Sequence, residues 1–153
     1  MHRQSRGFTL LELMVVIALV GIVLGAVSLA TGSSPARQAR QEAGLMLQLV
    51  QQLREQAVNE GREYGLRVQP HAYQVFRLEP QGWQPAGALH HIAQDVHMHL
   101  EQEGLRVSLD RLAPQVLALS SDEVSAFVLS FAFAGQVLTS VVSDGIGEPW
   151  IEG

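Results

Sequence analysis

The chain begins with a long apolar run and continues with shorter segments in which apolar and polar residues alternate. No charged residue occurs between Leu13 and Ala36, and this stretch is rich in leucine, valine and isoleucine. An α-helix rises about 1.5 Å per residue, so a run of this length can cross a hydrocarbon core of about 30 Å. The pattern therefore predicts a membrane-spanning helix over residues 8–30.

A second helix is predicted over residues 31–60. It is expected to have a kink or break near its start, because residues 31–35 weaken a helix and Pro35 lacks an amide hydrogen. Beyond that point apolar residues recur at alternating spacings of four and three, which places them on one helical face: Ala39, Ala43, Met46, Val50, Leu53 and Ala57. We expect this face to pack on a sheet of the same domain and the helix to end at Gly61.

From residue 61 onward the pattern becomes strand-like, with turn signals between the alternating segments. The predicted strands are residues 64–69, 73–79, 96–100, 105–109, 115–119, 127–133 and 136–142. Turns at 70–72 and 134–135 indicate two hairpins, of which the first is expected to lie across the helix. The end of the chain has loop composition, and Trp150 is expected to cover an edge of the core. The predicted fold class is α+β, a long amino-terminal helix packed on an antiparallel β domain over residues 61–153.

Composition limits the functions open to the chain. It has 153 residues and no cysteine, so disulfide bonds and thiolate chemistry are excluded. Ten basic residues, all of them arginine, stand against fifteen acidic ones. This balance argues against nucleic acid as the main partner, since phosphate contacts need clustered cations.

The amino terminus adds charges to the apolar run. Arg3 and Arg6 form a basic head without a balancing acid, which favours a cytoplasmic amino terminus. A secretory signal would have a shorter apolar core followed by a small-residue cleavage site. Glu12 lies at the start of the apolar run, where a lone carboxylate costs on the order of 2–3 kcal/mol unless it finds a partner. Such a residue is a candidate for function.

The residues Gly7-Phe8-Thr9-Leu10-Leu11-Glu12, followed by the apolar run, resemble the prepilin signature of type IV pilins and type II secretion pseudopilins. The resemblance implies that a prepilin peptidase removes residues 1–7 by cutting between Gly7 and Phe8, and that the same enzyme N-methylates Phe8. It also implies a type IV pilin-like fold and a role for Glu12 in subunit assembly. Removal of the leader would leave eight arginines against fifteen acids, a net charge of −7.

Two pairings are open to the Glu12 carboxylate. Phe8 and Glu12 are four residues apart, so the carboxylate could neutralise the amine of its own chain. Alternatively, it could pair with the Phe8 amine of a neighbouring subunit and so fix the axial register of assembly. We favour the intermolecular pairing on the strength of the family resemblance.

The later part of the chain resembles one branch of this family. The similar features are a helix ending near Glu60-Gly61, the segments Tyr64-Gly65-Leu66 and Trp83-Gln84-Pro85, and a late strand-glycine-strand hairpin. They resemble the H-type minor pseudopilin of type II secretion. This implies a low-copy subunit at or near the tip of the periplasmic pseudopilus, which helps to assemble it and to export folded proteins through the outer membrane. The alternative is a minor pilin of a type IV pilus, acting in pilus priming or DNA uptake.

The resemblance also implies partners and a location. The partners would be other minor pseudopilins, the major pseudopilin, the prepilin peptidase, the inner-membrane secretion platform and inner-membrane lipid, with secreted cargo or the secretin as further contacts. Nucleic acid is not expected. The chain would cross the inner membrane once, with its amino terminus cytoplasmic and its carboxy-terminal domain periplasmic, and would join the pseudopilus.

The remaining polar clusters do not indicate an active site or a metal site. Four histidines, His90, His91, His97 and His99, fall within ten residues, but no cysteine accompanies them and Asp95 is the only nearby carboxylate before Glu101. Residues 120–123 have the composition of a cap or turn. Asp144, Glu148 and Glu152 do not suffice for calcium, which takes six or more converging oxygens. We expect no catalytic, cofactor-binding or metal-binding residues, and no enzymatic activity.

A role in DNA uptake would make a specific demand on the structure. It would require an exposed basic strip, and the arginines available for one are Arg62, Arg67, Arg77, Arg106 and Arg111. They could supply it only if they converge in space.

Overall fold

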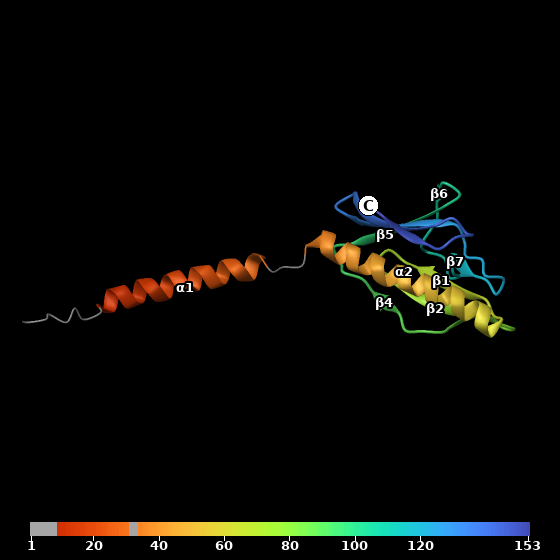
Figure 1. Cartoon of the computed structure of the whole chain (residues 1–153), viewed down its shortest axis with the longest axis horizontal. Helices are drawn as coiled ribbons and strands as arrows, with labels where there is room; N and C mark the ends of the chain where they lie inside the picture. The colour runs from red at the N-terminus through yellow and green to blue at the C-terminus, as the bar shows by residue number, and fades with distance from the viewer. Residues whose placement is uncertain (1–8, 31–33) are drawn as a thin grey trace, which may run out of the picture. The chain divides into compact units, whose positions relative to one another are not determined.

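The computed structural model describes residues 9–30 and 34–153, except for the side chains of 25–30 (Figure 1). The chain divides into two units, Met1–Ser33 and Ser34–Gly153. The first unit contains helix α1 (Leu10–Ala30), and the second contains helix α2 (Pro35–Glu60) together with the strands. The buried core cluster runs from Ala39 to Val141, so the second unit has a hydrophobic core of its own.

Two antiparallel sheets accompany α2 in the second unit. The first sheet has the order β3–β2–β1–β7, with β4 pairing with the start of β2. Its strands are β1 (Tyr64–Val68), β2 (Ala72–Glu79), β3 (Gly82–Pro85), β4 (His90–His91) and β7 (Val116–Ala118). The second sheet has the order β10–β9–β8–β5–β6. Its strands are β5 (His97–Gln102), β6 (Leu105–Arg106), β8 (Phe127–Phe133), β9 (Gln136–Ser143) and β10 (Trp150–Glu152).

Helix α2 begins and ends at residues with defined capping geometry. The Ser34 Oγ accepts a hydrogen bond from the Arg37 amide at 3.3 Å, and Pro35 lies in the first turn, where an amide hydrogen is not needed. Gly61 follows the helix with φ of 62°, a left-handed conformation that glycine adopts without a Cβ penalty. The predicted end of the helix is confirmed. The predicted break falls partly on residues 31–33, which lie outside the described residues.

The apolar face predicted for α2 is the face that the fold buries. Its six residues are at most 5% exposed: Ala39, Ala43, Met46, Val50, Leu53 and Ala57. The helix contacts β1 and β7 of the first sheet and β8, β9 and β10 of the second, and Figure 1 shows it lying along the strands. The prediction that this helix packs on the sheets of its own domain is therefore confirmed.

Both predicted hairpins are present. β1 and β2 pair with Tyr64 opposite Arg77, across the turn at residues 70–71. β8 and β9 are joined at Ala134 and Gly135, whose φ values of 49° and 80° are both in the left-handed region. The ends of these strands differ from the predicted ends by one residue at most.

The structure differs from the predicted strands in several places, and β3 and β4 are short strands that the sequence did not predict. Of the strand predicted over residues 105–109, only Leu105–Arg106 is a strand. The Val107 amide still donates to the Leu100 carbonyl at 2.8 Å, and further along the chain the side chain of Gln115 binds the amide and carbonyl of Val68 in the first sheet at 2.9 and 3.0 Å. Trp150, which was expected to cover an edge of the core, is only partly buried. It lies in β10, an edge strand that the sequence did not predict, and it is 42% exposed.

Gly65 provides a test of the packing in the first sheet. A Cβ at this position would lie 2.6 Å from the Cβ of Pro114 and 3.1 Å from the Trp83 ring, so Gly65→Ala forces the backbone or these rings to shift. We expect the free energy of unfolding to fall by about 1–3 kcal/mol. Urea denaturation of a fragment comprising residues 34–153 would measure the change.

Gly44→Ala is the matched control. A Cβ at Gly44 in α2 meets no atom within 4 Å, and alanine favours a helix over glycine by about 1 kcal/mol. This control is expected to stabilise the fragment. Equal stability of the parent and Gly65→Ala would show that the contact with Pro114 is not tight.

Candidate functional site

The predicted assembly residue Glu12 lies in the first turn of α1. Thr9 caps this helix: its Oγ1 accepts a hydrogen bond from the Glu12 amide at 3.3 Å, and its carbonyl accepts from the Leu13 amide at 3.2 Å. A threonine followed three residues later by glutamate has the spacing of a capping box, and negative charge in the first turn interacts favourably with the helix dipole. Gly7 and Phe8, the predicted cleavage and methylation residues, lie outside the described residues.

The exposed part of α1 is apolar around the whole helix. From Leu10 to Leu24, Glu12 is the one charged residue, and the large apolar side chains are between 46% and 79% exposed. Among the described residues, no helix is long and apolar enough to cross a membrane. The predicted span over residues 8–30 includes Phe8 and the side chains of 25–30, which are not described, and it stays a prediction.

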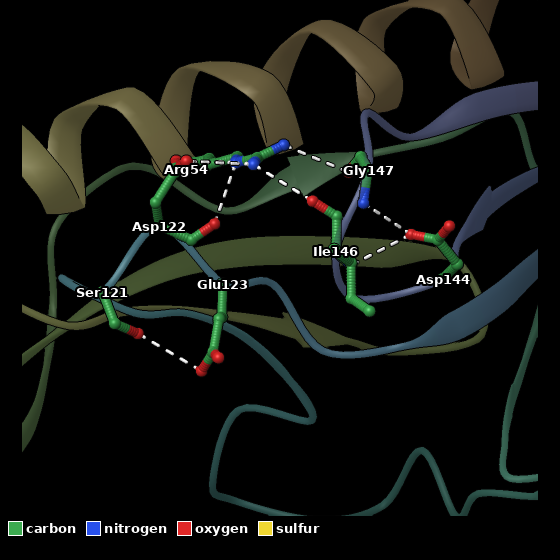
Figure 2. A network of polar contacts seen from close by, with 7 residues as sticks. All are labelled: Arg54, Ser121, Asp122, Glu123, Asp144, Ile146 and Gly147. Carbon is green, nitrogen blue, oxygen red and sulfur yellow. Dashed lines mark hydrogen bonds and ion pairs between the residues drawn. The ribbon is translucent and has the colours of Figure 1, made fainter.

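A second polar arrangement, which we call the Arg54 network, joins α2 to two loops (Figure 2). Arg54 donates from Nε and Nη2 to the carboxylate of Asp122 at 2.8 and 3.1 Å. Its Nη1 and Nη2 donate to the carbonyl oxygens of Gly147 and Ile146 at 3.1 and 3.3 Å. One guanidinium therefore ties the helix both to the loop around Asp122 and to the carboxy-terminal loop.

Asp144 completes the Arg54 network by organising the carboxy-terminal loop. Its Oδ1 accepts hydrogen bonds from the amides of Ile146 and Gly147 at 3.0 and 2.7 Å. These bonds stabilise the ionised carboxylate and lower the pKa of Asp144, with a smaller contribution from Arg54. The hydrogen bond to Asp122 stabilises the charged form of Arg54 and so raises the pKa of Arg54. The loop backbone is thus fixed, while the side chain of Ile146 is 84% exposed.

Sequence reasoning missed this network. Arg54 and Asp122 are 68 residues apart, so no local pattern relates them. The expectation of a turn at residues 120–123 is confirmed, since Asp122 has φ of 72° and its amide donates to the Leu119 carbonyl at 3.1 Å. The available signals were an arginine on the flank of an amphipathic helix and an acidic turn. Neither signal predicts that these two segments are in contact.

The histidines have different contact partners. His90 Nε2 lies 3.1 Å from Glu42 Oε2 on α2. His71 donates from Nδ1 to the carbonyl of Val96 at 3.0 Å, and its ring meets that of His97 edge-on with centroids 4.4 Å apart. Within residues 9–30 and 34–153, no three His, Cys, Asp or Glu side chains are placed to hold a metal ion.

The arginines considered for a basic strip fall into different environments. Arg62 and Arg77 both pair with Glu79, which neutralises part of their charge. Arg67 and Arg111 instead line a hollow on the domain surface. Among the described residues, the candidates for the strip are therefore not a single run of unpaired cations, which is the arrangement that phosphate binding favours.

A capped apolar helix with an acid in its first turn, followed by an amphipathic helix on antiparallel sheets, defines a pilin-like protein. Solved structures share this fold. The crystal structure of the minor pseudopilin EpsH from the type II secretion system of Vibrio cholerae matches with a TM-score of 0.69 and 23% identity, over 78% of this chain and 99% of that one. The solution structure of E. coli GspH matches with a TM-score of 0.64 and 19% identity, over 76% of this chain and 89% of that one.

Relatives with higher identity define the family. The profile of the prokaryotic N-terminal methylation motif matches residues 2–28. The type II secretion system protein H of Pseudomonas aeruginosa is 37% identical over 173 aligned positions, covering 98% of this chain and 97% of that protein. Its counterpart in Aeromonas hydrophila is 32% identical over 149 positions, covering 84% of this chain and 81% of that protein. The chain belongs to the type II secretion system protein H family.

The Arg54 network can be tested by Arg54→Met, which keeps most of the apolar stem and removes every donor to the two loops. We expect the free energy of unfolding to fall by about 1–2 kcal/mol, discounted for the solvent exposure of Asp122. The amides of Ile146 and Gly147 should exchange with solvent faster, because the loop loses its tie to α2. Hydrogen exchange measured by NMR would detect this change.

Arg40→Met is the control, since Arg40 is an exposed residue of the same helix and loses the same charge. It should leave the loop amides unchanged. Equal exchange rates in the two variants would contradict a holding role for Arg54.

Proposed function

We propose that the chain is a minor pseudopilin of the type II secretion system. It acts at or near the tip of the periplasmic pseudopilus, helps to assemble it, and supports export of folded proteins through the outer membrane. The observation that carries this proposal is the 37% identity to the P. aeruginosa protein over nearly the full length of both chains. Its work is binding and assembly, and we propose no catalytic role.

The amino-terminal segment supports an anchor in the inner membrane. A helix that is apolar all round is typical of a membrane span or of a deeply buried core. In this proposal residues 1–7 are removed, Phe8 becomes the N-methylated amino terminus, and α1 crosses the membrane once from a cytoplasmic amino terminus. The second unit, which has its own core, folds in the periplasm.

The proposed partners follow from this arrangement. The apolar surface of α1 meets lipid before assembly and the equivalent helices of other minor pseudopilins and the major pseudopilin afterwards. The prepilin peptidase and the inner-membrane platform act on the same segment. Cargo or the secretin would meet the periplasmic domain.

Glu12 is proposed to pair with the Phe8 amine of a neighbouring subunit. The Thr9 cap supports this role, because it fixes the backbone of the first turn and so limits the positions that the Glu12 carboxylate can take. Because the carboxylate has few accessible positions, it can pair with a neighbouring amine in few axial registers. A mobile carboxylate would allow more registers. Pairing with the amine of its own chain is the alternative.

Processing provides the first test. The mature chain should begin with methylated Phe8, and Gly7→Ala should be cleaved slowly, because the added methyl group crowds the backbone that the peptidase must approach. Mass spectrometry of protein extracted from membranes gives both results. An intact Met1 terminus in a strain with active peptidase would contradict the proposal.

Glu12→Ala and Glu12→Gln separate assembly from anchoring. Both variants remove a carboxylate from apolar surroundings, so insertion should become easier and cleavage should remain normal. If Glu12 pairs with a neighbouring amine, both should recover less of the other minor pseudopilins on pull-down from membranes and should support less secretion. Secretion assays and quantitative pull-down at native expression are the measurements.

Glu55→Gln supplies the control, because it makes the same chemical change at an exposed position on α2. It should assemble like the parent. If the Glu12 variants also assemble and secrete normally, Glu12 neutralises only its own terminus. Recovery with type IV pilus subunits in place of secretion subunits would favour the minor pilin alternative.

A further inference from the structure

A hollow on the periplasmic domain gathers positive charge in a chain that is acidic overall. It has a volume of about 430 Å³ and lies between the β1–β2 turn, β4 and residues 109–112. Its charged and titratable lining consists of Arg67, His71, His91, Asp110 and Arg111. Fifteen acids outnumber ten arginines in the whole chain, yet a single acid lines this hollow.

The position of Arg67 is the main evidence that the hollow binds a ligand. Its guanidinium carbon lies 5.4 Å from the centre of the Phe76 ring, so the aromatic face supports the charged group. Its Nε is buried and has no hydrogen-bond partner among the described residues. Arg67 lines the hollow and makes no ion pair among the described residues, so the exposed part of its guanidinium can donate to an acceptor that enters the hollow.

Arg111 provides a second cation from another segment of the lining. The arginine ion pairs in the described part of the chain are made by Arg54, Arg62 and Arg77. Arg67 and Arg111 are therefore both available to an incoming anion. Two guanidinium groups from different segments can donate to the two oxygens of one carboxylate, because the planar guanidinium matches that group.

The rim of the hollow adds an apolar element. Leu112 lines it and is 85% exposed, and Leu109 lines it from a partly buried position. An exposed leucine beside two cations suits an acidic residue with an apolar neighbour. A protein segment can carry an acidic residue beside an apolar one, whereas a simple inorganic anion has no apolar part.

We propose that this hollow binds the carboxylate of an acidic side chain from a partner protein. Arg67 and Arg111 donate to its oxygens, and Leu112 contacts an apolar residue next to it. Nucleic acid fits less well, because a chain with an excess of acids repels a long polyphosphate and Asp110 lies in the lining. The inference goes beyond the assembly role of Glu12 and does not depend on it.

The test uses the full chain in detergent micelles and two end-blocked hexapeptides. One peptide has a single glutamate between two leucines, and the other has glutamine at the same position. We expect saturable binding of the glutamate peptide, seen by NMR titration of the labelled protein, with the largest shifts around Arg67 and Arg111. The glutamine peptide should bind about tenfold more weakly, since it lacks the charge-assisted hydrogen bonds.

Three variants distinguish the hollow from general charge effects. Arg111→Gln should weaken the glutamate peptide about tenfold, and its exposed position puts the fold at no risk. Arg67→Lys should also weaken binding, because lysine keeps the charge but lacks the planar fork. Arg40→Gln removes the same charge from an exposed position on α2 and should leave binding unchanged.

Several results would overturn the proposal. They are the absence of saturable binding by the glutamate peptide, equal binding of the two peptides, and equal losses in the Arg40 and Arg111 variants. Inorganic phosphate and a single-stranded oligonucleotide form separate arms. Displacement of either by the glutamate peptide supports a carboxylate site, whereas binding of either that the peptide does not displace overturns it.

Discussion

Burial of one face of α2 against two sheets is the constraint on which the rest of the domain depends. Ala39, Ala43 and Ala57 are completely buried, and their small side chains let the helix backbone approach the strands closely. Met46 on the same face is also fully buried. Interiors packed to this density do not tolerate sliding, so the burial fixes the helix along its axis. Every contact from the flank of the helix, including those of Arg54, starts from that fixed position.

Polar side chains then hold the segments that the core does not reach. The Gln115 side chain occupies the place of a backbone partner at Val68, and Arg54 does the same for the carbonyls of Ile146 and Gly147. In each case a side chain bonds to backbone groups at a place where regular strand pairing has ended. The loops are therefore ordered by single residues, and a change at one of them affects a whole loop while the core remains.

The distribution of charge suits a protein whose work is contact with other chains. Within the described part of the chain, Arg54, Arg62 and Arg77 are paired with acids, whereas Arg67 and Arg111 are left facing a hollow. Charges that are paired internally contribute to the fold, and unpaired ones are available to a partner. Complementary charge selects partners and register more than it adds affinity, which is what a subunit of an ordered fibre in the type II secretion family requires.

The sequence by itself determined the features that depend on local chemistry. The buried face of α2, its end at Gly61 and the two hairpins follow from periodicity and turn residues within a few positions of each other, and the prepilin signature around Glu12 is likewise contiguous. Only the tertiary structure decided which distant segments meet. Asp122, the partner of Arg54, lies 68 residues away in the sequence. The last strand, β10, forms because the edge of β9 is free to pair with it. The position of Arg67 beside the Phe76 ring, and the hollow that it shares with Arg111, are likewise visible only in the tertiary structure, because contacts and burial are properties of the assembled surroundings and not of the residue.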